Sequence, residues 1–250
     1  MGLSPSVVKD CREVLLDRPL TAARRVFYNL DGPWYRRGIA EAVGSERYSH
    51  PALFDMDRRL AAIMPARGGT FFEAGAHDGY TQSNTYYLER RRGWSGVLVE
   101  PVPELRAKCE RRRTRSRVFG CALVGPDYAD PDIAIHFGDL MSTVGADSHA
   151  ASGLAVVGRS AYSVSVPART LSSVLEEAGV GELDLMVLDL EGNELDALRG
   201  LDLERHAPRH LLVETLERAT QQPQLDALLA SHYEPLDALS DYDLLYRRRD

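Results

Sequence analysis

The 250-residue sequence predicts an α/β domain built on a doubly wound, mainly parallel sheet. Residues 70–101 read as a strand, a glycine loop, a helix and a second strand, which is one βαβ unit. Residues 183–190 form a nearly continuous apolar run, as expected of a central strand buried on both faces. Strand and helix patterns alternate through the rest of the chain, which favours a parallel sheet covered by helices. We therefore expect this domain over residues 66–250.

Residues 1–65 are predicted to form a helical N-terminal extension. Apolar residues recur at helical spacing after Ser4-Pro5, and residues 53–63 repeat the pattern before Pro65. Asp31-Gly32-Pro33 interrupts the two helical stretches. We expect this extension either to cover the substrate cleft or to form the contact of a homodimer.

The βαβ unit ends on a carboxylate in a position suited to a nucleotide. Thr70–Phe72 is a short β-prone run, and residues 73–79 form an acidic, glycine-containing loop. Residues 81–92 read as a helix, and the strand 96–99 leads into Glu100. Ligands bind outside the carboxyl ends of parallel strands, and a carboxylate about twenty residues after the loop can accept hydrogen bonds from a ribose diol.

The later elements follow in an order that suits the same sheet. Ranges that read as helices are 102–113, 170–178 and the start of 221–247; Gly179 is the expected C-cap of the second. Ranges that read as strands are 117–121, 133–137, 163–166, 183–190 and 210–214, followed by two more strands at the end of 221–247. Residues 138–160 are rich in small side chains and are expected to be a mobile substrate loop.

The acidity of the loop indicates which nucleotide it binds. A dinucleotide site usually carries G-x-G-x-x-G, because its pyrophosphate lies against bare backbone amides. Here Gly75 and Gly79 are four residues apart, and Glu73 and Asp78 would repel a pyrophosphate. A ligand with an ammonium and a sulfonium group suits these carboxylates better, which favours S-adenosylmethionine and disfavours a nicotinamide-dependent oxidoreductase.

Two segments carry a family resemblance. FEAGAHDGYTQSNTYYLERRRGWSGVLVEP (72–101) and LDLMVLDLEGNELDALRGLDL (183–203) resemble, in order, the motifs of the FkbM-type S-adenosylmethionine-dependent methyltransferases. The likeness covers residues 70–215 and implies the Rossmann-like fold of class I methyltransferases. It also implies tailoring of a secondary metabolite, such as a polyketide or an attached sugar, in antibiotic biosynthesis.

The glycine loop, the resemblance and the strand ends together give the cofactor-binding candidates. Asn84 matches the family's "SNT", and His77 departs from a pattern that more often has Asn. Ala122 and Leu123 follow the third strand, where related enzymes place backbone near the adenine. The full set is Glu73, Gly75, Ala76, His77, Asp78, Gly79, Asn84, Glu100, Pro101, Ala122 and Leu123.

The catalytic candidates are Asp189 and Glu191, where the buried strand emerges. Methyl transfer to a hydroxyl needs a base or a metal, because a free hydroxyl keeps its proton at neutral pH. We expect Asp189 to be the principal catalytic carboxylate, with Glu191 holding the substrate or sharing the proton. The alternative is structural, with Asp189 capping the next helix and Glu191 supporting a loop.

Other groups could assist the acceptor. Asp189, Glu191 and Glu214 lie at predicted strand ends and supply the oxygen ligands that Mg²⁺ prefers, so a magnesium-assisted variant stays open. His136 and His149 flank the small-residue stretch and are alternative bases. His206 and His210 are separated by Pro208, which argues against a helical zinc pair.

Composition limits the remaining possibilities. The net charge of −7 gives nucleic acid little electrostatic support. Three cysteines without paired spacing fit a reducing cytoplasm, and no apolar stretch is long enough for a membrane span. We expect a cytoplasmic enzyme with a small-molecule acceptor and neither a nucleic-acid nor a membrane partner. O-methylation is favoured; N-methylation and a non-catalytic cofactor-binding scaffold are the alternatives.

Overall fold

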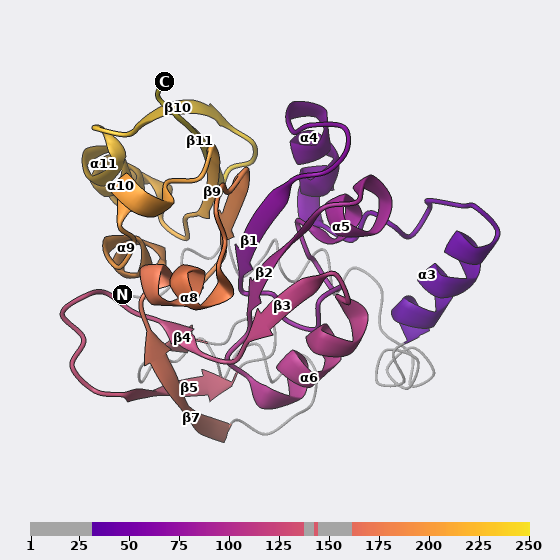
Figure 1. Cartoon of the computed structure of the whole chain (residues 1–250), viewed down its shortest axis with the longest axis horizontal. Coiled ribbons are helices and arrows are strands. Elements are labelled where there is room, and N and C mark those ends of the chain that lie inside the picture. Colours follow the sequence, from indigo (N-terminus) through magenta and orange to yellow (C-terminus); the bar gives the residue numbers. More distant parts are fainter. Residues whose placement is uncertain (1–31, 138–142, 145–161) are drawn as a thin grey trace. The chain divides into compact units, whose positions relative to one another are not determined.

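The computed structural model describes residues 32–137, 143–144 and 162–250 (Figure 1). The chain divides into two compact units, Met1–His50 and Pro51–Asp250. In the first unit, helix α3 (Gly32–Ala42) is described, with an ion pair of 2.7 Å between Arg37 and Glu41 on successive turns. The expected roles of this region as a lid or a dimer contact stay predictions.

The second unit contains the predicted alternation of helices and strands. Its helices are η1 (Leu53–Asp55), α4 (Met56–Ile63), α5 (Tyr86–Arg92), α6 (Pro103–Arg112), α8 (Leu171–Ala178), α9 (Glu194–Arg199), α10 (Leu203–His206) and α11 (Arg218–Leu229). Its strands are β1 (Thr70–Ala74), β2 (Ser95–Val99), β3 (Ser116–Phe119), β4 (Ala122–Leu123), β5 (Asp132–Phe137), β6 (Thr143–Val144), β7 (Tyr162–Arg169), β8 (Leu185–Leu188), β9 (His210–Glu214), β10 (Tyr233–Ala238) and β11 (Asp243–Arg248).

The main sheet is the predicted doubly wound, mainly parallel one. Its strand order is β10-β11-β9-β8-β1-β2-β3, and the five strands from β9 to β3 run parallel. The chain builds outward from β1 to β3, then returns to β8 on the other side of β1. The strand order therefore reverses beside β1, and the carboxyl ends of β1, β2 and β8 meet there, where ligands bind in this architecture.

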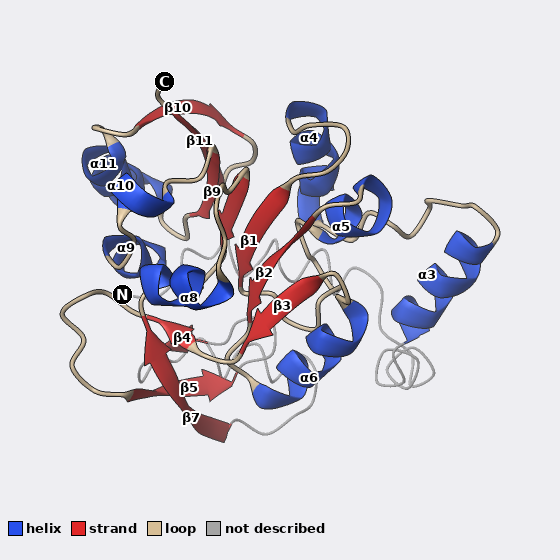
Figure 2. Ribbon diagram, in the orientation of Figure 1, coloured by secondary structure: helices blue, strands red, loops and turns tan. Residues whose placement is uncertain are grey.

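Alternating side chains of the strands form two apolar layers. Phe72, Met186 and Leu188 pack with residues of α8, α9 and α11. Phe71 and Leu185, one residue out of step, pack on the other face with residues of α4, α5 and α6. Helices thus cover both faces of the sheet, as Figure 2 shows. The pattern follows from the two-residue period of a strand, because neighbouring side chains point to opposite faces.

Helix α4 belongs to this α/β unit. Its buried Met56 and Leu60 lie in the same apolar layer as Phe71. The compact unit accordingly begins at Pro51, before the residue 66 at which we expected the domain to start. Among the described residues, no helix combines the length and the apolarity that crossing a membrane requires.

A smaller sheet, in the order β4-β7-β5-β6, adjoins the main one. Strands β5 and β7 pair antiparallel over six residues each, from Asp132 opposite Pro167 to Phe137 opposite Tyr162. These are the two strands predicted around the small-residue stretch. That stretch was expected to be a loop, but β6 lies inside it and pairs with β5; residues 138–142 and 145–160 fall outside the described residues.

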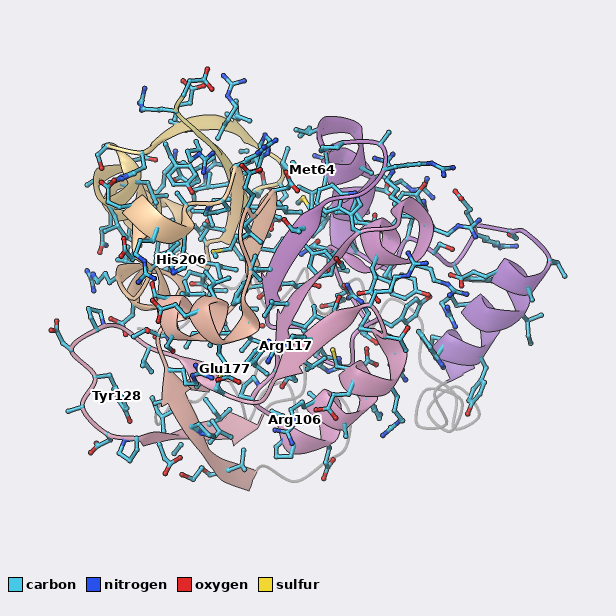
Figure 3. The ribbon with its side chains drawn as sticks, viewed as in Figure 1. Met64, Arg106, Arg117, Tyr128, Glu177 and His206 are labelled. Atoms are coloured by element: carbon cyan, nitrogen blue, oxygen red, sulfur yellow. The ribbon has the colours of Figure 1, made fainter. Side chains whose placement is uncertain are left out.

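The two edge strands of the main sheet differ. On β3, Arg117 donates from Nη1 to the carbonyl of Glu177 on α8 at 2.8 Å, and both side chains are labelled in Figure 3. At the opposite edge, β10 carries Pro235 and has an irregular register with β11 between Pro235 and Asp237.

Candidate active site

An open cavity with about 900 Å³ of empty space lies where β1, β2 and β8 end. Ten of the residues predicted from sequence line it: Glu73, Gly75, His77, Asn84, Glu100, Pro101, Ala122, Leu123, Asp189 and Glu191. The other four, Ala76, Asp78, Gly79 and Glu214, do not. The cofactor and catalytic roles of the ten stay predictions, but the structure brings them together.

Gly75 allows β1 and β8 to approach each other at the cavity. Its φ is +81°, and a Cβ at this position would lie 2.1 Å from the carbonyl oxygen of Asp189. Only glycine adopts this conformation at little cost and leaves room for the neighbouring backbone.

Glu73 organises the polypeptide that follows β1. Its carboxylate accepts hydrogen bonds from the Ser83 hydroxyl, from the Asn84 backbone N–H at 2.8 Å and from the Thr85 hydroxyl at 2.5 Å. Arg113, which is 1% exposed, lies 3.5 Å from the same carboxylate and donates at 2.9 Å to Glu89. Glu73 therefore holds the loop in shape as well as lining the cavity.

The segment 81–85 differs from the helix expected there. Helix α5 begins at Tyr86, and residues 81–85 form turns. Asp78 accepts from the backbone N–H groups of Tyr80 and Thr81 at 3.0 and 2.7 Å, while Glu73 takes that of Asn84. Side-chain acceptors therefore replace the helical hydrogen bonds of this segment, which explains why its helical pattern is not realised.

Of the four candidates that do not line the cavity, three stabilise the glycine loop by contacts outside the cavity. Asp78 pairs with Arg112 of α6 at 2.6 Å, and Ala76 is buried in the apolar layer beneath β1. A Cβ on Gly79 would lie 2.8 Å from the Arg113 side chain and 3.0 Å from the sulfur of Cys109. Glycine is needed at this position because α6 packs closely against it, and no contact with a ligand is required to explain it.

Glu100 is a buried carboxylate fixed by backbone. It is 5% exposed, and its oxygens accept from the N–H groups of His77 and Val102 at 2.8 Å each. Burial raises its pKa to about 7, although the charge of His77 and the two hydrogen bonds favour the ionised form. Each oxygen keeps a second lone pair, so a ribose diol could still bind there.

Asp189 and Glu191 lie in a group of buried carboxyls beyond β8. Burial raises the pKa of both Asp189 and Glu191. The charges of Asp189 and Glu194 raise the pKa of Glu191 further. Burial, together with the charges of Asp189 and Glu191, raises the pKa of Glu214.

Glu194 stabilises the turn that presents Glu191. Its Oε1 accepts from the N–H groups of Leu190 and Gly192 at 2.8 and 3.0 Å, and its side chain is buried. Burial raises the pKa of Glu194 to about 7. The turn gives Glu191 a positive φ of 53°, which non-glycine residues seldom adopt and which places its side chain on the cavity wall.

The described residues contain no group of three or more histidine, cysteine, aspartate or glutamate side chains arranged to hold a metal ion. The alternative with Asp189, Glu191 and Glu214 as Mg²⁺ ligands therefore has no support in this geometry.

Of the two histidines considered as bases, the side chain of His136 and the whole of His149 lie outside the described residues.

Several cavity residues were not predicted from sequence. They are Ala74, Thr81, Gln82, Val99, Leu105, Cys121, Ile135, Leu190 and Asn193. Four of them, Ala74, Val99, Cys121 and Leu190, are direct neighbours of predicted residues, so extending each motif by one position would have found these four. Ile135 is different, because it reaches the cavity from the smaller sheet. Asn193 donates from Nδ2 to the carbonyl of Leu123 at 2.8 Å and so ties the β8 turn to β4.

The chain shares sequence with a curated methyltransferase over part of its length. Over 78 residues, the chain is 38% identical to the methyltransferase sdnD of Sordaria araneosa, a match covering 28% of this chain and 30% of that protein. The chain thus matches less than a third of the length of this curated relative.

Solved structures with a similar arrangement include two methyltransferases. One is the S-adenosylhomocysteine-bound PaMTH1 of Podospora anserina, at TM-score 0.46 and 12% identity, covering 100% of this chain and 98% of that one. The other comes from Geobacter sulfurreducens, at TM-score 0.45 and 13% identity, covering 100% and 99%. At these scores the fold assignment rests on the strand order and the family match.

The family match is extensive. Residues 73–243 match the model of the methyltransferase FkbM domain, and this range begins at the β1 carboxylate Glu73 and ends at the start of β11. It includes the glycine loop, Glu100 and the turn after β8, so every predicted site residue lies within it. The chain belongs to the methyltransferase FkbM domain family.

Proposed function

We propose that this protein transfers a methyl group from S-adenosylmethionine to a hydroxyl oxygen of a small molecule. Family membership supports methyl transfer, with S-adenosylmethionine as the donor. The observation that carries the proposal is the single cavity wall that joins Glu100 at the end of β2 to Asp189 and Glu191 beyond β8. One end suits a nucleoside, and the other offers carboxyls that can take up a proton.

Bound S-adenosylmethionine would supply an electrophilic methyl group on a sulfonium. Methyl transfer would break its sulfur–methyl bond as the oxygen–methyl bond of the product formed, and the hydroxyl proton would have to leave the oxygen. In our proposal Asp189 accepts this proton, while Glu191 orients the hydroxyl. Proximity and orientation then lower the barrier, because a direct displacement requires the oxygen in line with the methyl group.

The protonation of the carboxyl group around Asp189 fits this role. A base that acts near neutral pH needs a pKa raised from that of an ordinary aspartate. Burial raises the pKa of Asp189, as this role requires. An amine acceptor would need less help from a base, so N-methylation is the second candidate reaction.

For the acceptor we propose a hydroxylated sugar or polyketide in secondary metabolism, supported by the family resemblance of the two motifs. The net charge of −7 favours such a molecule over nucleic acid. A cytoplasmic location and a homodimer contact through residues 1–65 belong to the same proposal.

Calorimetric titration with S-adenosylhomocysteine, with and without Mg²⁺ and with NAD as a control, tests the cofactor. We expect dissociation constants on the order of micromolar for S-adenosylhomocysteine and no binding of NAD. Failure of S-adenosylhomocysteine to bind would favour the non-catalytic alternative, and binding of NAD would contradict our interpretation of the acidic loop.

A further inference from the structure

The cavity wall contains a polar residue to which no role has been given. Gln82 lies in the turn between the glycine loop and α5 and lines the cavity. Within the described part of the chain, its carboxamide has no hydrogen-bond partner, whereas the neighbouring Ser83 and Thr85 are bound to Glu73. A donor of this kind, half-buried on a cavity wall, is available to a ligand.

The backbone of Gln82 is in an unfavourable conformation. Its φ is +60°, in the left-handed region. Five non-glycine residues of the described chain have a positive φ, and three of them, His77, Gln82 and Glu191, line this cavity. Such strain persists where the surrounding structure imposes it, and it concentrates at ligand sites. Gln82 thus combines a left-handed backbone conformation with a position on the cavity wall.

The order of the strands indicates which part of the cofactor lies near Gln82. Glu100 at the end of β2 suits the ribose, and Ala122 and Leu123 lie on the β3 side of it. If the adenine occupies that side, the amino-acid part extends the other way, toward β1 and β8. The polypeptide that covers this region is the turn after β1, which contains Gln82 and Asn84.

The charges around the cavity indicate what the amino-acid part needs there. Its ammonium group has the carboxylate of Glu73 available, a residue that lines the cavity. Its carboxylate has no such partner, because neither lysine nor arginine lines the cavity among the described residues. The described wall does offer neutral N–H donors, and an amide that donates to an ionised acceptor forms a strong hydrogen bond.

We propose that the carboxamide of Gln82 binds the carboxylate of the methionine part of S-adenosylmethionine. The inference rests on the proposed function and assigns a residue to one group of the cofactor. Asn84, which lines the same cavity, would be the second donor.

Two ligands separate this contact from the rest of the site. S-adenosylhomocysteine carries the amino-acid group, and 5′-methylthioadenosine has the same nucleoside and thioether without it. We expect Gln82→Ala and Gln82→Gly each to weaken S-adenosylhomocysteine binding by about 10-fold or more in calorimetry, since a hydrogen bond to a charged group is lost. Their affinity for 5′-methylthioadenosine should equal that of the unchanged protein.

The pair of variants separates the side chain from the backbone. Alanine keeps the backbone strain of the left-handed conformation, whereas glycine removes it. Both variants lack the carboxamide, so an effect seen in both is due to the loss of the carboxamide. Gln224→Ala, on the exposed side of α11, is the matched control and should change neither affinity.

Several results would overturn the proposal. Equal weakening of both ligands would indicate a disturbed loop, and an effect of alanine without one of glycine would indicate backbone strain. Unchanged S-adenosylhomocysteine affinity with a raised acceptor KM would place Gln82 at the acceptor instead. If the unchanged protein bound neither ligand, the proposed function itself would be wrong.

Discussion

At the scale of single residues, the proposed chemistry depends most on Asp189. Replacing it by Asn keeps the size of the side chain but removes its ability to accept a proton. We expect Asp189→Asn to lower kcat at least about 100-fold, as for the loss of a general base. Its affinity for S-adenosylhomocysteine should stay within about threefold, because the proposed role concerns the acceptor. Methylation assays with hydroxylated acceptors and calorimetry measure the two quantities.

The control for Asp189 is Asp130→Asn in the exposed segment before β5. It makes the same chemical change away from the cavity and should leave kcat unchanged. Full activity of Asp189→Asn would remove the assignment of the base and favour the interpretation of Asp189 as structural.

Glu100 should control the cofactor instead. Its pKa of about 7 means that it is protonated below this pH and ionised above it. A carboxylate accepts the hydrogen bonds of a ribose diol better than a carboxylic acid does. Binding of S-adenosylhomocysteine should therefore strengthen between about pH 6 and pH 8. In Glu100→Gln we expect affinity about 10-fold lower at pH 8 and little change with pH.

Exposed Glu110 of α6 supplies the matched variant for Glu100. Glu110→Gln should keep both the affinity and its dependence on pH. If Glu100→Gln retained the pH dependence of the unchanged protein, another group would be responsible for it.

At the scale of elements, the junction of β1 and β8 depends on Gly75. Gly75→Ala introduces a Cβ 2.1 Å from the carbonyl oxygen of Asp189 at a φ of +81°. We expect the free energy of unfolding to fall by about 2 kcal/mol or more, because the strands must separate or the backbone must change. Chemical denaturation followed by circular dichroism measures this change.

Gly181→Ala is the comparison for Gly75. A Cβ at Gly181 meets nothing within 4 Å. Its effect should be within about 0.5 kcal/mol, as for other surface substitutions. Equal stability of the two variants would mean that the close approach of β1 and β8 is not required.

The elements also show what the sequence can predict. The apolar run at 183–190 and the pattern at 210–214 predicted β8 and β9, because both strands are buried on two faces. The turns at 81–85 were predicted as helix, because the helical pattern of residues 81–92 is a local signal. The side chains that accept their N–H groups, Glu73 and Asp78, lie earlier in the chain and are not part of that pattern.

The candidate site was predictable to a similar extent. Motifs at the strand ends identified ten residues of the cavity wall, because strand ends gather at one edge of a parallel sheet. Ile135 could not be found in this way. It reaches the cavity only through the pairing of β5 with β7, a contact between segments far apart in the sequence. Asp78 and Gly79 share the motif but serve the packing of α6.

At the scale of the whole molecule, the buried carboxyls should make stability depend on pH. Glu194 has a usual pKa of 4.5, which burial raises to about 7. Between these values the folded protein keeps a proton that the unfolded chain has lost. The free energy of unfolding should therefore fall as pH rises through this window, by up to about 1.4 kcal/mol per pH unit for this group.

Thermal unfolding from pH 5 to pH 8 tests this expectation. In Glu194→Gln, the Oε1 acceptor for Leu190 and Gly192 is retained and the titration is removed, so Tm should fall less steeply with pH. Glu110→Gln should reproduce the slope of the unchanged protein. Parallel slopes in all three proteins would show that Glu194 does not carry the effect.

The outer strand β10 has a consequence for association in solution. An open sheet edge offers unpaired N–H and C=O groups to which another chain could add a strand. Pro235 has no N–H, and the irregular register beside it interrupts the regular spacing of these groups. Strand addition at this edge is therefore disfavoured, and with it association of two copies by pairing of their β10 strands.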